Sequence, residues 1–315
     1  MQKKLTLIIP CFNEEAVLAK KIKDCLKSGG EFDKIIIVDD HSSDRTAQIA
    51  LAEAKKNPKI IFLPNRSKKG KTSAVRLGIT KAKTDLVGIT DADVLIEKGA
   101  LTKIAAVFDD PRIGLVGAEM KIIGSASFQD KIFRVFRATL SSIDSLPFFH
   151  GQLMVIRKSL KVYPRAKIQA DDIDLAVRVR LKNFRAVFAP GSFFLQDASD
   201  KNNFAKRLRR DEGTIKALWY YKSLLFNRHY GRFGLICFPA CFFLYCLQPV
   251  LFTFLVIYLF FNLSWLFRFI YILILLAVPF FKNLVYFNLI VVLAMIRVFT
   301  SKSTTSDSWK TQRSR

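Results

Sequence analysis

Short apolar runs alternate with polar turns and amphipathic segments along the first part of the chain. Strands are predicted at residues 5–10, 34–38, 60–63 and 87–90. Each of the first three is followed by a polar turn and a segment with helical spacing. Repetition of strand, turn and helix predicts an α/β fold with a mainly parallel sheet covered by helices, and with the polar turns along one edge.

An amphipathic segment at residues 128–137 fits two interpretations. One helical face carries Phe128, Ile132, Val135 and Phe136, and basic side chains lie opposite. A helix packed in the core shows this pattern, and so does a helix lying on a membrane surface. Both remain open at this point.

The last quarter of the chain has the composition of a membrane region. From Phe233 to Phe299 it is almost uninterrupted Leu, Ile, Val and Phe, broken by Arg268, Lys282 and Arg297. We therefore expect a soluble domain at residues 1–232, two or three membrane helices at residues 233–299, and a basic tail at residues 300–315. The protein would be a multi-pass protein of the cell membrane.

The first apolar stretch is too long for one simple crossing. As a single helix, residues 233–267 would extend roughly 50 Å, against a hydrocarbon core of about 30 Å. We therefore expect Pro239 or Pro249 to break the helix.

The charge balance is strongly basic, with 50 Lys and Arg against 26 Asp and Glu and a formal net charge of +24. No nucleic-acid-binding motif accompanies the charge, so nucleic acid is not an expected partner. Basic residues crowd near the apolar region, where anionic lipid and a pyrophosphate-bearing substrate explain them better. No secretory signal follows Met1, so we expect the first domain to be cytoplasmic.

Two carboxylates follow the strand at residues 87–90, in the turn Asp91-Ala92-Asp93. The small Ala92 leaves room for a ligand, and two hard oxygen donors at this spacing suit a divalent cation shared with phosphate oxygens. Ligands of open α/β sheets bind at the carboxyl ends of strands. A solvated turn would show the same spacing, so the choice between a cation site and a solvated turn depends on the neighbouring motifs.

Those motifs occur in a fixed order along the chain: Ile9-Pro10-Cys11-Phe12-Asn13-Glu14, Val38-Asp39-Asp40-His41-Ser42-Ser43-Asp44, Asn65 with Lys69-Gly70-Lys71 and Gly78, and Asp91-Ala92-Asp93. In this order and spacing the chain resembles a family 2 glycosyltransferase. The resemblance implies a GT-A fold, a nucleotide-diphosphate-sugar donor, and Mg²⁺ or Mn²⁺ held by Asp93 with help from Asp91.

Carried over residue by residue, the resemblance implies a nucleotide pocket lined by Pro10, Asn13 and Glu14. Asp40 would accept from the base edge, and Lys71 would lie near the base or phosphates. Asp91 would contribute to donor binding as well. From its position before a predicted helix, Asn13 can also cap that helix.

A second group of carboxylates lies in Ala170-Asp171-Asp172 at the start of a predicted helix. The corresponding place in the family is usually a Glu-Asp pair whose Asp deprotonates the acceptor, which maps the general base to Asp172. Asp171 stands where Glu is usual. Carboxylates also favour a first helical turn because of the helix dipole, so a simple capping role fits the same residues.

Residues 206–213 stand where membrane-bound relatives carry Gln-x-x-Arg-Trp. Arg209 matches the arginine, and the resemblance implies that it neutralises the leaving diphosphate. Lys206 and Arg210 replace the glutamine and the tryptophan. An aromatic platform for a growing sugar chain is therefore missing, which argues against processive polymerisation.

The resemblance implies an inverting glycosyltransferase, and together with the apolar region it predicts action on a membrane-associated acceptor, such as a polyprenyl-linked saccharide, in cell-envelope glycan synthesis. Two alternatives remain. One is a processive polysaccharide synthase, and the other is a membrane protein that binds nucleotide sugars without turnover.

Overall fold

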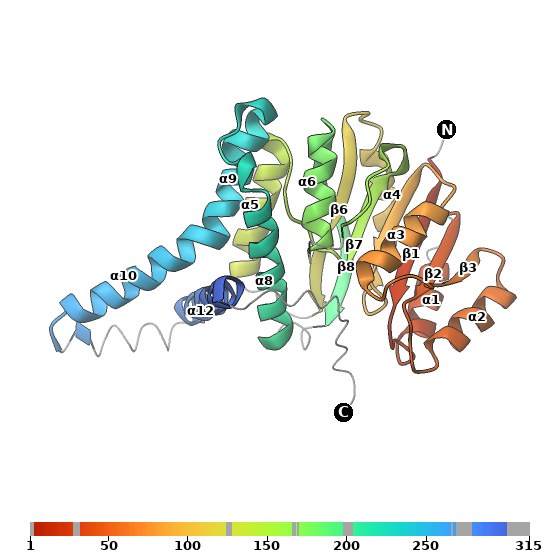
Figure 1. Ribbon diagram of the computed structural model, residues 1–315, viewed down its shortest axis with the longest axis horizontal. Coiled ribbons are helices and arrows are strands. Elements are labelled where there is room, and N and C mark those ends of the chain that lie inside the picture. Colours follow the sequence, from red (N-terminus) through yellow and green to blue (C-terminus); the bar gives the residue numbers. More distant parts are fainter. Residues whose placement is uncertain are drawn as a thin grey trace. The chain divides into compact units, whose positions relative to one another are not determined.

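The computed structural model describes residues 3–27, 32–123, 128–165, 168, 170–197, 204–265, 267–268 and 279–300. The chain forms two compact units, labelled by element in Figure 1. The first contains Met1–Gly124 and Asp144–Ala198, and the second contains Ser125–Ile143 and Ser199–Thr304.

The first unit is built on a sheet that is eight-stranded within the described residues. Its strands are β1 (Leu5–Cys11), β2 (Lys34–Asp39), β3 (Ile60–Pro64), β4 (Leu86–Thr90), β5 (Leu95–Ile96), β6 (Ile113–Ile123), β7 (Leu153–Arg157) and β8 (Arg185–Asp197). They lie in the order β3-β2-β1-β4-β7-β6-β8-β5. β7 is antiparallel to β4 and β6, and β5 is antiparallel to β8, while the other pairs are parallel. The predicted α/β fold is confirmed, with a mixed and mostly parallel sheet.

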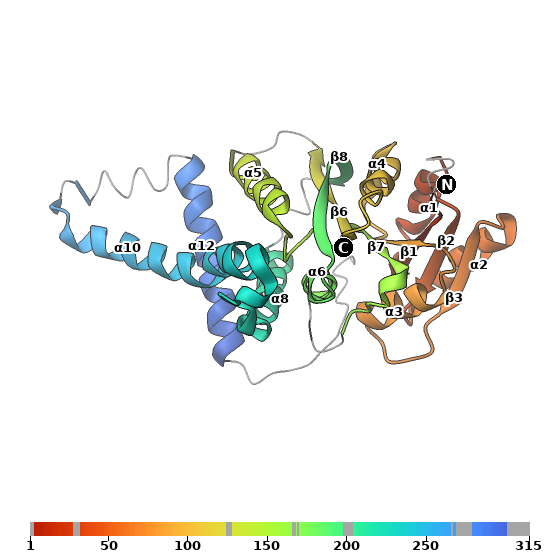
Figure 2. The same ribbon diagram turned by 90° about the horizontal axis from the view of Figure 1, so that it is seen from above.

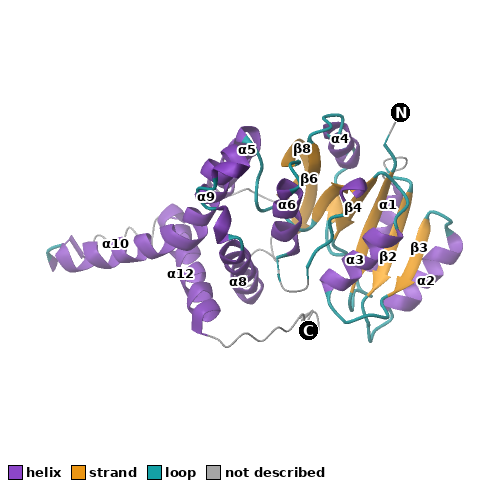
Figure 3. Ribbon diagram, turned by 45° about the horizontal axis from the view of Figure 1, so that its top comes forward, coloured by secondary structure: helices purple, strands orange, loops and turns teal. Residues whose placement is uncertain are grey.

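Helices cover both faces of this sheet. They are α1 (Leu18–Lys27), α2 (Thr46–Lys56), α3 (Lys71–Lys81), α4 (Ala100–Val107) and α6 (Asp171–Leu181), with the short turn η1 (Lys158–Leu160). α1, α2 and α4 pack on the face that carries Leu5, Leu7 and Ile9. α3 and α6 lie on the other side (Figures 2 and 3). Gly78 lets α3 approach the sheet closely, because a Cβ there would lie 2.5 Å from Ile8 Cγ2.

The strand directions explain why the polar turns gather at one edge. β1 runs parallel to β2 and β4, so the turns that follow these three strands leave the sheet at the same edge. β7 begins at that edge, since Thr90 at the end of β4 pairs with Leu153 at its start. The gathering of polar turns expected from the sequence is therefore present.

The second unit consists of helices. They are α5 (Phe128–Ile143), α8 (Phe204–Tyr220), η2 (Lys222–Leu224), η3 (Arg228–Tyr230), η4 (Phe233–Cys237), α9 (Phe238–Phe242), η5 (Phe243–Leu247), α10 (Gln248–Asn262) and α12 (Pro279–Thr300). The contacts therefore group α5 and α8 with the apolar helices. The domain boundary predicted from hydropathy alone lay at Phe233. On α5, Ile132 is 46% and Val135 66% exposed, which excludes a helix buried along its whole apolar face.

Among the described residues, two helical stretches are long and apolar enough to cross a membrane, judged by length and composition. The stretch Phe233–Asn262 has 30 residues and Phe281–Thr300 has 20. The expectation that Pro239 or Pro249 breaks the first stretch was wrong. A π-helical turn, η4 or η5, precedes each proline, and its wider spacing accommodates a residue without a backbone N–H. A third span would have to include residues 269–278, which lie outside the described residues.

Candidate active site

The turns after β1 and β2 are joined by hydrogen bonds at the strand-end edge. Asn13 N donates to Ser42 Oγ at 3.0 Å, and Asn13 Oδ1 accepts from Ser43 N at 2.9 Å. Asn13 has a positive φ of 53°, which asparagine tolerates better than most residues. The expectation that Asn13 caps the helix was wrong, because α1 begins only at Leu18, whose N donates to Glu14 O at 2.9 Å.

Pro10 and Glu14 lie in this same region, where the sequence predicts a nucleotide pocket. Pro10 is a buried residue near the end of β1. The side chain of Glu14 is 8% exposed, and its backbone N donates to Thr46 Oγ1 at 2.8 Å. Both residues are therefore held at the strand-end edge, and their contact with a nucleotide remains a prediction.

Asp40 is fully buried and organises the turn before α3. Asn65 Nδ2 donates to Asp40 Oδ1 and Gly70 N donates to Asp40 Oδ2, both at 2.7 Å. Gly70 has a φ of 144°, a conformation that favours glycine. Asp40 therefore positions the segment that delivers Lys71. Its predicted contact with a base edge would come in addition to these bonds and stays a prediction.

Lys71 begins α3 and brings three carboxylates into one electrostatic group. Its Nζ lies 2.7 Å from Asp91 Oδ1 and 4.0 Å from Asp171 Oδ2. Although burial disfavours the charged amine, Asp91, Asp171 and Asp172 together raise the pKa of Lys71. The turn after β4 is thus linked through one cation to the first turn of α6.

Asp172 has the environment of a general base. It lies in the first turn of α6, and its Oδ2 accepts from Phe149 N at 3.4 Å. Burial, followed by the charge of Asp171, raises the pKa of Asp172 to about 7. A base works best when its pKa is near the working pH, so this carboxylate suits proton abstraction.

The third carboxylate of this helical turn has a structural role. Asp174 is fully buried, and its Oδ1 accepts from Arg165 Nε at 3.0 Å and from Nη2 at 2.9 Å. Its Oδ2 accepts from Arg165 N at 2.9 Å. Because both oxygens are bound within the protein, Asp174 is set apart from the chemistry.

The donor set at the Asp91-Ala92-Asp93 turn fits a shared divalent cation. In the part of the chain that is described, no three His, Cys, Asp or Glu residues are grouped to hold a metal. Asp91 and Asp93 offer two hard oxygen ligands, and Asp91 is already paired with Lys71. Such a site suits an ion that completes its coordination with diphosphate oxygens and water, as Mg²⁺ commonly does.

Arg209 lies on α8 of the second unit, with an exposed side chain. Arg210 is exposed on the same helix, and Lys206 is partly buried there. The proposed action of Arg209 on a leaving diphosphate remains a prediction.

Sequence reasoning missed two features of this site. One is the contact of Lys71 with both Asp91 and Asp171. These two aspartates lie 80 residues apart in the chain. The other is Lys21 of α1, which is buried beneath the Asp91-Ala92-Asp93 turn and donates to Thr90 and Val94. A signal for Lys21 was available, since it falls between Leu18 and Ile22 on the apolar side of the helix.

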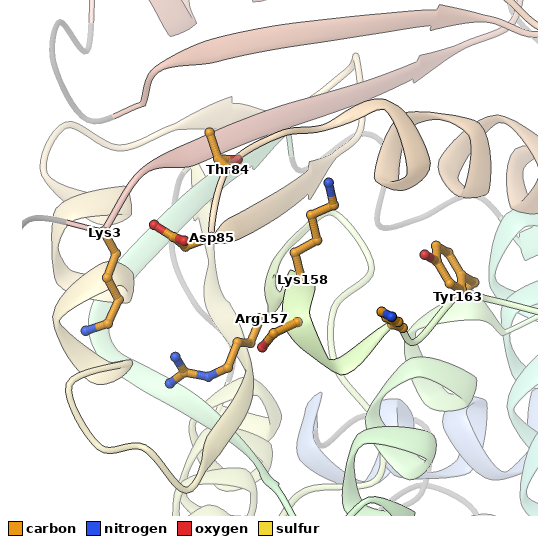
Figure 4. A pocket seen from close by; sticks show the side chains of 8 residues that line it. Lys3, Thr84, Asp85, Arg157, Lys158 and Tyr163 are labelled. Carbon is orange, nitrogen blue, oxygen red and sulfur yellow. The ribbon is translucent and has the colours of Figure 1, made fainter.

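A separate hollow of about 410 Å³ lies at the opposite edge of the sheet. Residues around it include Lys3, Thr84, Asp85, Arg157, Lys158 and Tyr163 (Figure 4). Arg157 pairs with Leu86 at the start of β4, one strand length from the Asp91 turn. Arg157 Nε donates to Ile113 O at 3.1 Å, and Lys158 Nζ donates to Ala82 O. These cations already bind the protein's own carbonyls, so the strand-end edge remains the candidate active site.

Comparison with known proteins adds relatives to this geometry. The chain is 26% identical over 198 residues to poly-beta-1,6-N-acetyl-D-glucosamine synthase of Staphylococcus aureus, which covers 59% of this chain and 48% of that protein. It is 31% identical over 129 residues to the probable glycosyltransferase YdaM of Bacillus subtilis, covering 39% of this chain and 31% of that protein. The chain thus spans about half or less of the length of these relatives.

Solved structures share the fold at low sequence identity. Mannosyltransferase PcManGT from Pyrobaculum calidifontis, in complex with GDP-Man and Mn²⁺, has a TM-score of 0.84 at 18% identity and covers 96% of this chain and 89% of that one. TarS 1-349 from S. aureus has a TM-score of 0.57 at 15% identity and covers 94% and 88%. These similarities confirm the GT-A fold.

Family models agree with the motifs and with the fold. The model described as Glycosyl transferase family 2 matches residues 6–163, and the model described as Glycosyl transferase family group 2 matches residues 86–284. The first match contains all four of the motifs that carry the resemblance, which together run from Ile9 to Asp93. The chain therefore belongs to glycosyl transferase family 2.

Proposed function

We propose that this family 2 enzyme transfers a sugar, with inversion, from a nucleotide-diphosphate donor to a membrane-associated acceptor. One observation carries the proposal most strongly. Asp172, whose pKa is raised to about 7, lies in the same charged group as Lys71 and Asp91 at the strand-end edge. This grouping supports a site in which one carboxylate would act as base for the acceptor while its neighbours would bind the diphosphate.

The donor would lie along the strand-end edge, with its nucleoside toward Pro10, Asn13, Glu14 and Asp40. Lys71 would contact the diphosphate, since an ammonium ion offsets phosphate charge. Asp93, assisted by Asp91, would hold Mg²⁺ or Mn²⁺, which when bound supplies a Lewis acid for the departing diphosphate. The GDP-Man and Mn²⁺ in the structurally similar mannosyltransferase support this assignment.

Asp172 would accept the proton of the acceptor hydroxyl as that oxygen attacks the anomeric carbon. The new bond joins the acceptor oxygen to the sugar, and the bond from the sugar to the diphosphate breaks. The electron pair of that bond leaves with the nucleoside diphosphate, and Arg209 would neutralise part of its charge. A single displacement of this kind inverts the configuration at the anomeric carbon.

Two apolar helical stretches support an acceptor held in a membrane, such as a polyprenyl-linked saccharide. Basic residues precede the first stretch, among them Lys222, Arg228 and Arg232. This is the flank expected on the cytoplasmic side, so we place the catalytic unit there in a multi-pass membrane protein. Similarity to a polysaccharide synthase of S. aureus supports a role in cell-envelope glycan synthesis.

That same similarity favours a second candidate, a processive synthase. Arg210, exposed on α8, stands where processive relatives place an aromatic residue, and this favours addition of one or a few sugars. The mass of the product on a lipid-linked acceptor separates the two candidates. A discrete increment supports limited addition, and a ladder of long products supports the synthase.

The proposed function is tested with the full chain purified in detergent. A panel of nucleotide sugars is supplied with Mn²⁺, and release of nucleoside diphosphate is measured with and without a lipid-linked saccharide. We expect one donor class to react, and Asp172→Asn to lose transfer while it still binds that donor. Donor binding without release in the wild-type protein would instead support a non-catalytic binding protein.

A further inference from the structure

Lys21 is a lysine in the core of the first unit, where lysine is rarely found. Its side chain is 1% exposed, and it lies on the same side of α1 as the buried Leu18, Ile22 and Cys25. The other lysines of this helix are all exposed, namely Lys20, Lys23 and Lys27. The buried position is therefore specific to Lys21.

The ammonium group of Lys21 binds both flanks of the Asp91-Ala92-Asp93 turn. Its Nζ donates to Thr90 Oγ1 at 2.9 Å and to Val94 O at 2.7 Å. One helical turn further along α1, Asp24 Oδ2 accepts from Ile96 N at 3.2 Å. A single face of α1 therefore holds the chain on each side of the two turn carboxylates.

Packing alone does not explain a charge at this place. Burial lowers the pKa of Lys21, while Asp24, Asp91 and Asp93 act in the opposite direction. An apolar side chain of similar length would fill the same space without the cost of desolvating an ammonium ion. What such a side chain would lack is the pair of hydrogen bonds across the turn.

We propose that Lys21 is a positioning residue that holds the Asp91-Ala92-Asp93 turn in a fixed conformation for the donor diphosphate and its divalent cation. This inference rests on the proposed function, in which the turn binds both groups. Two carboxylates on one short turn repel each other, and a loose turn loses conformational entropy when it binds a ligand. Because the hydrogen bonds of Lys21 restrain both flanks of the turn in the free protein, less conformational entropy is lost when the ligand binds.

The test uses Lys21→Met in the full chain and three measurements. In ligand-free protein, hydrogen exchange of the amides at residues 91–94 should accelerate by about tenfold or more, because the turn opens more often. Titration calorimetry with Mn²⁺ and UDP, and in parallel Mn²⁺ and GDP, should show affinity for the bound nucleotide weakened by about tenfold or more. The melting temperature should change little, because the removal of a buried charge offsets the loss of the hydrogen bonds to Thr90 Oγ1 and Val94 O.

A matched pair of variants at Thr90, which accepts a hydrogen bond from Lys21, distinguishes loss of this hydrogen bond from a general loss of stability. Thr90→Val removes the acceptor for Lys21 and should repeat both changes in part, while Thr90→Ser keeps the hydroxyl and should behave as the wild type. Unchanged exchange and affinity in Lys21→Met overturn the inference, as does a lower melting temperature with unchanged affinity. If the wild-type protein binds neither nucleotide with Mn²⁺, the proposed function fails first, and the inference about donor binding fails with it.

Discussion

The ammonium of Lys71 lies 2.7 Å from Asp91 Oδ1 and 4.0 Å from Asp171 Oδ2. One side chain at the start of α3 therefore connects the turn after β4 with the first turn of α6. In the proposed reaction these two turns serve the donor and the acceptor, respectively. Lys71 is thus placed to influence both the binding of the diphosphate and the charge of Asp172.

Lys71→Met should weaken catalysis because it leaves these carboxylates without their shared cation. We expect kcat/KM to fall by about ten- to a hundredfold, since a hydrogen bond between charged groups contributes roughly 1.5–3 kcal/mol. Lys71→Arg, which keeps the charge, should retain more activity. Steady-state kinetics with the reactive donor measures both variants, and wild-type kcat/KM in Lys71→Met would remove this residue from the mechanism.

Asp172→Asn should abolish most transfer, because the amide cannot accept the acceptor proton. A positioned general base contributes about 10²–10⁴-fold to the rate. Donor affinity, measured by calorimetry, should remain close to that of the wild type, since the base acts on the acceptor. If Asp171→Asn is inactive and Asp172→Asn active, the general base has been assigned one residue too far along the chain.

Asp174→Asn is a useful control for the same helical turn. It removes the charge of the fully buried Asp174 from its pair with Arg165, whose side chain is 37% exposed, so it should lower the free energy of unfolding by about 1–3 kcal/mol. Urea denaturation of the three Asn variants, at positions 171, 172 and 174, would separate loss of stability from loss of chemistry.

The rate should rise with pH through about 7, because Asp172 must be ionised to accept a proton and its pKa is raised to about 7. Asp171→Asn should move this midpoint to lower pH, since the charge of Asp171 contributes to the raised pKa. A profile of kcat/KM against pH checks both statements. An unchanged midpoint in Asp171→Asn would show that a different group titrates.

Stability should change with pH in the opposite direction. An aspartate in the unfolded chain has a pKa of about 3.9, so between roughly pH 4 and 7 the folded protein binds more protons at Asp172 than the unfolded chain. The free energy of unfolding contributed by this group therefore falls as pH rises through that window. Asp211, whose pKa is raised to about 6 by burial, contributes with the same sign. Urea denaturation at several pH values should show a weaker decline for Asp172→Asn.

Asp93→Asn keeps the shape of the side chain and removes one charged ligand. If a divalent cation binds at this turn, turnover of the donor should fall by orders of magnitude while the melting temperature changes little. Excess chelator should have the same effect on the wild-type protein, and added Mn²⁺ should restore the activity. Full activity in the presence of chelator would exclude the ion from the reaction.

Local patterns in the sequence were sufficient for the fold class and for the first four strands. The apolar runs at residues 5–10, 34–38, 60–63 and 87–90 became β1 to β4 within a residue or two. Parallel strands place their following turns at one edge, so the gathering of Pro10, Asp40 and Asp91 could be anticipated from strand direction alone. The two-residue β5 has no comparable signal, because its pairing with β8 comes from residues about 100 positions away.

The same limit applied to the helices of the second unit. The sequence predicted a break at Pro239 or Pro249, yet a π-helical turn precedes each proline and the helix continues past both. Such turns depend on how the backbone bonds shift along the whole helix, which residue preferences do not report.

Within the site, the sequence by itself determined which candidate groups to consider, because a strand end points to Asp91 and Asp93 and the family resemblance points to Asp172. Tertiary structure alone decided how they are connected. Lys71 meets Asp91 and Asp171, and Lys21 meets Thr90 and Val94, across separations of about 20 to 100 residues. Contacts of this kind arise from how helices pack on the sheet; local periodicity indicates that Lys21 faces the core, but it does not identify the residues that Lys21 or Lys71 contacts.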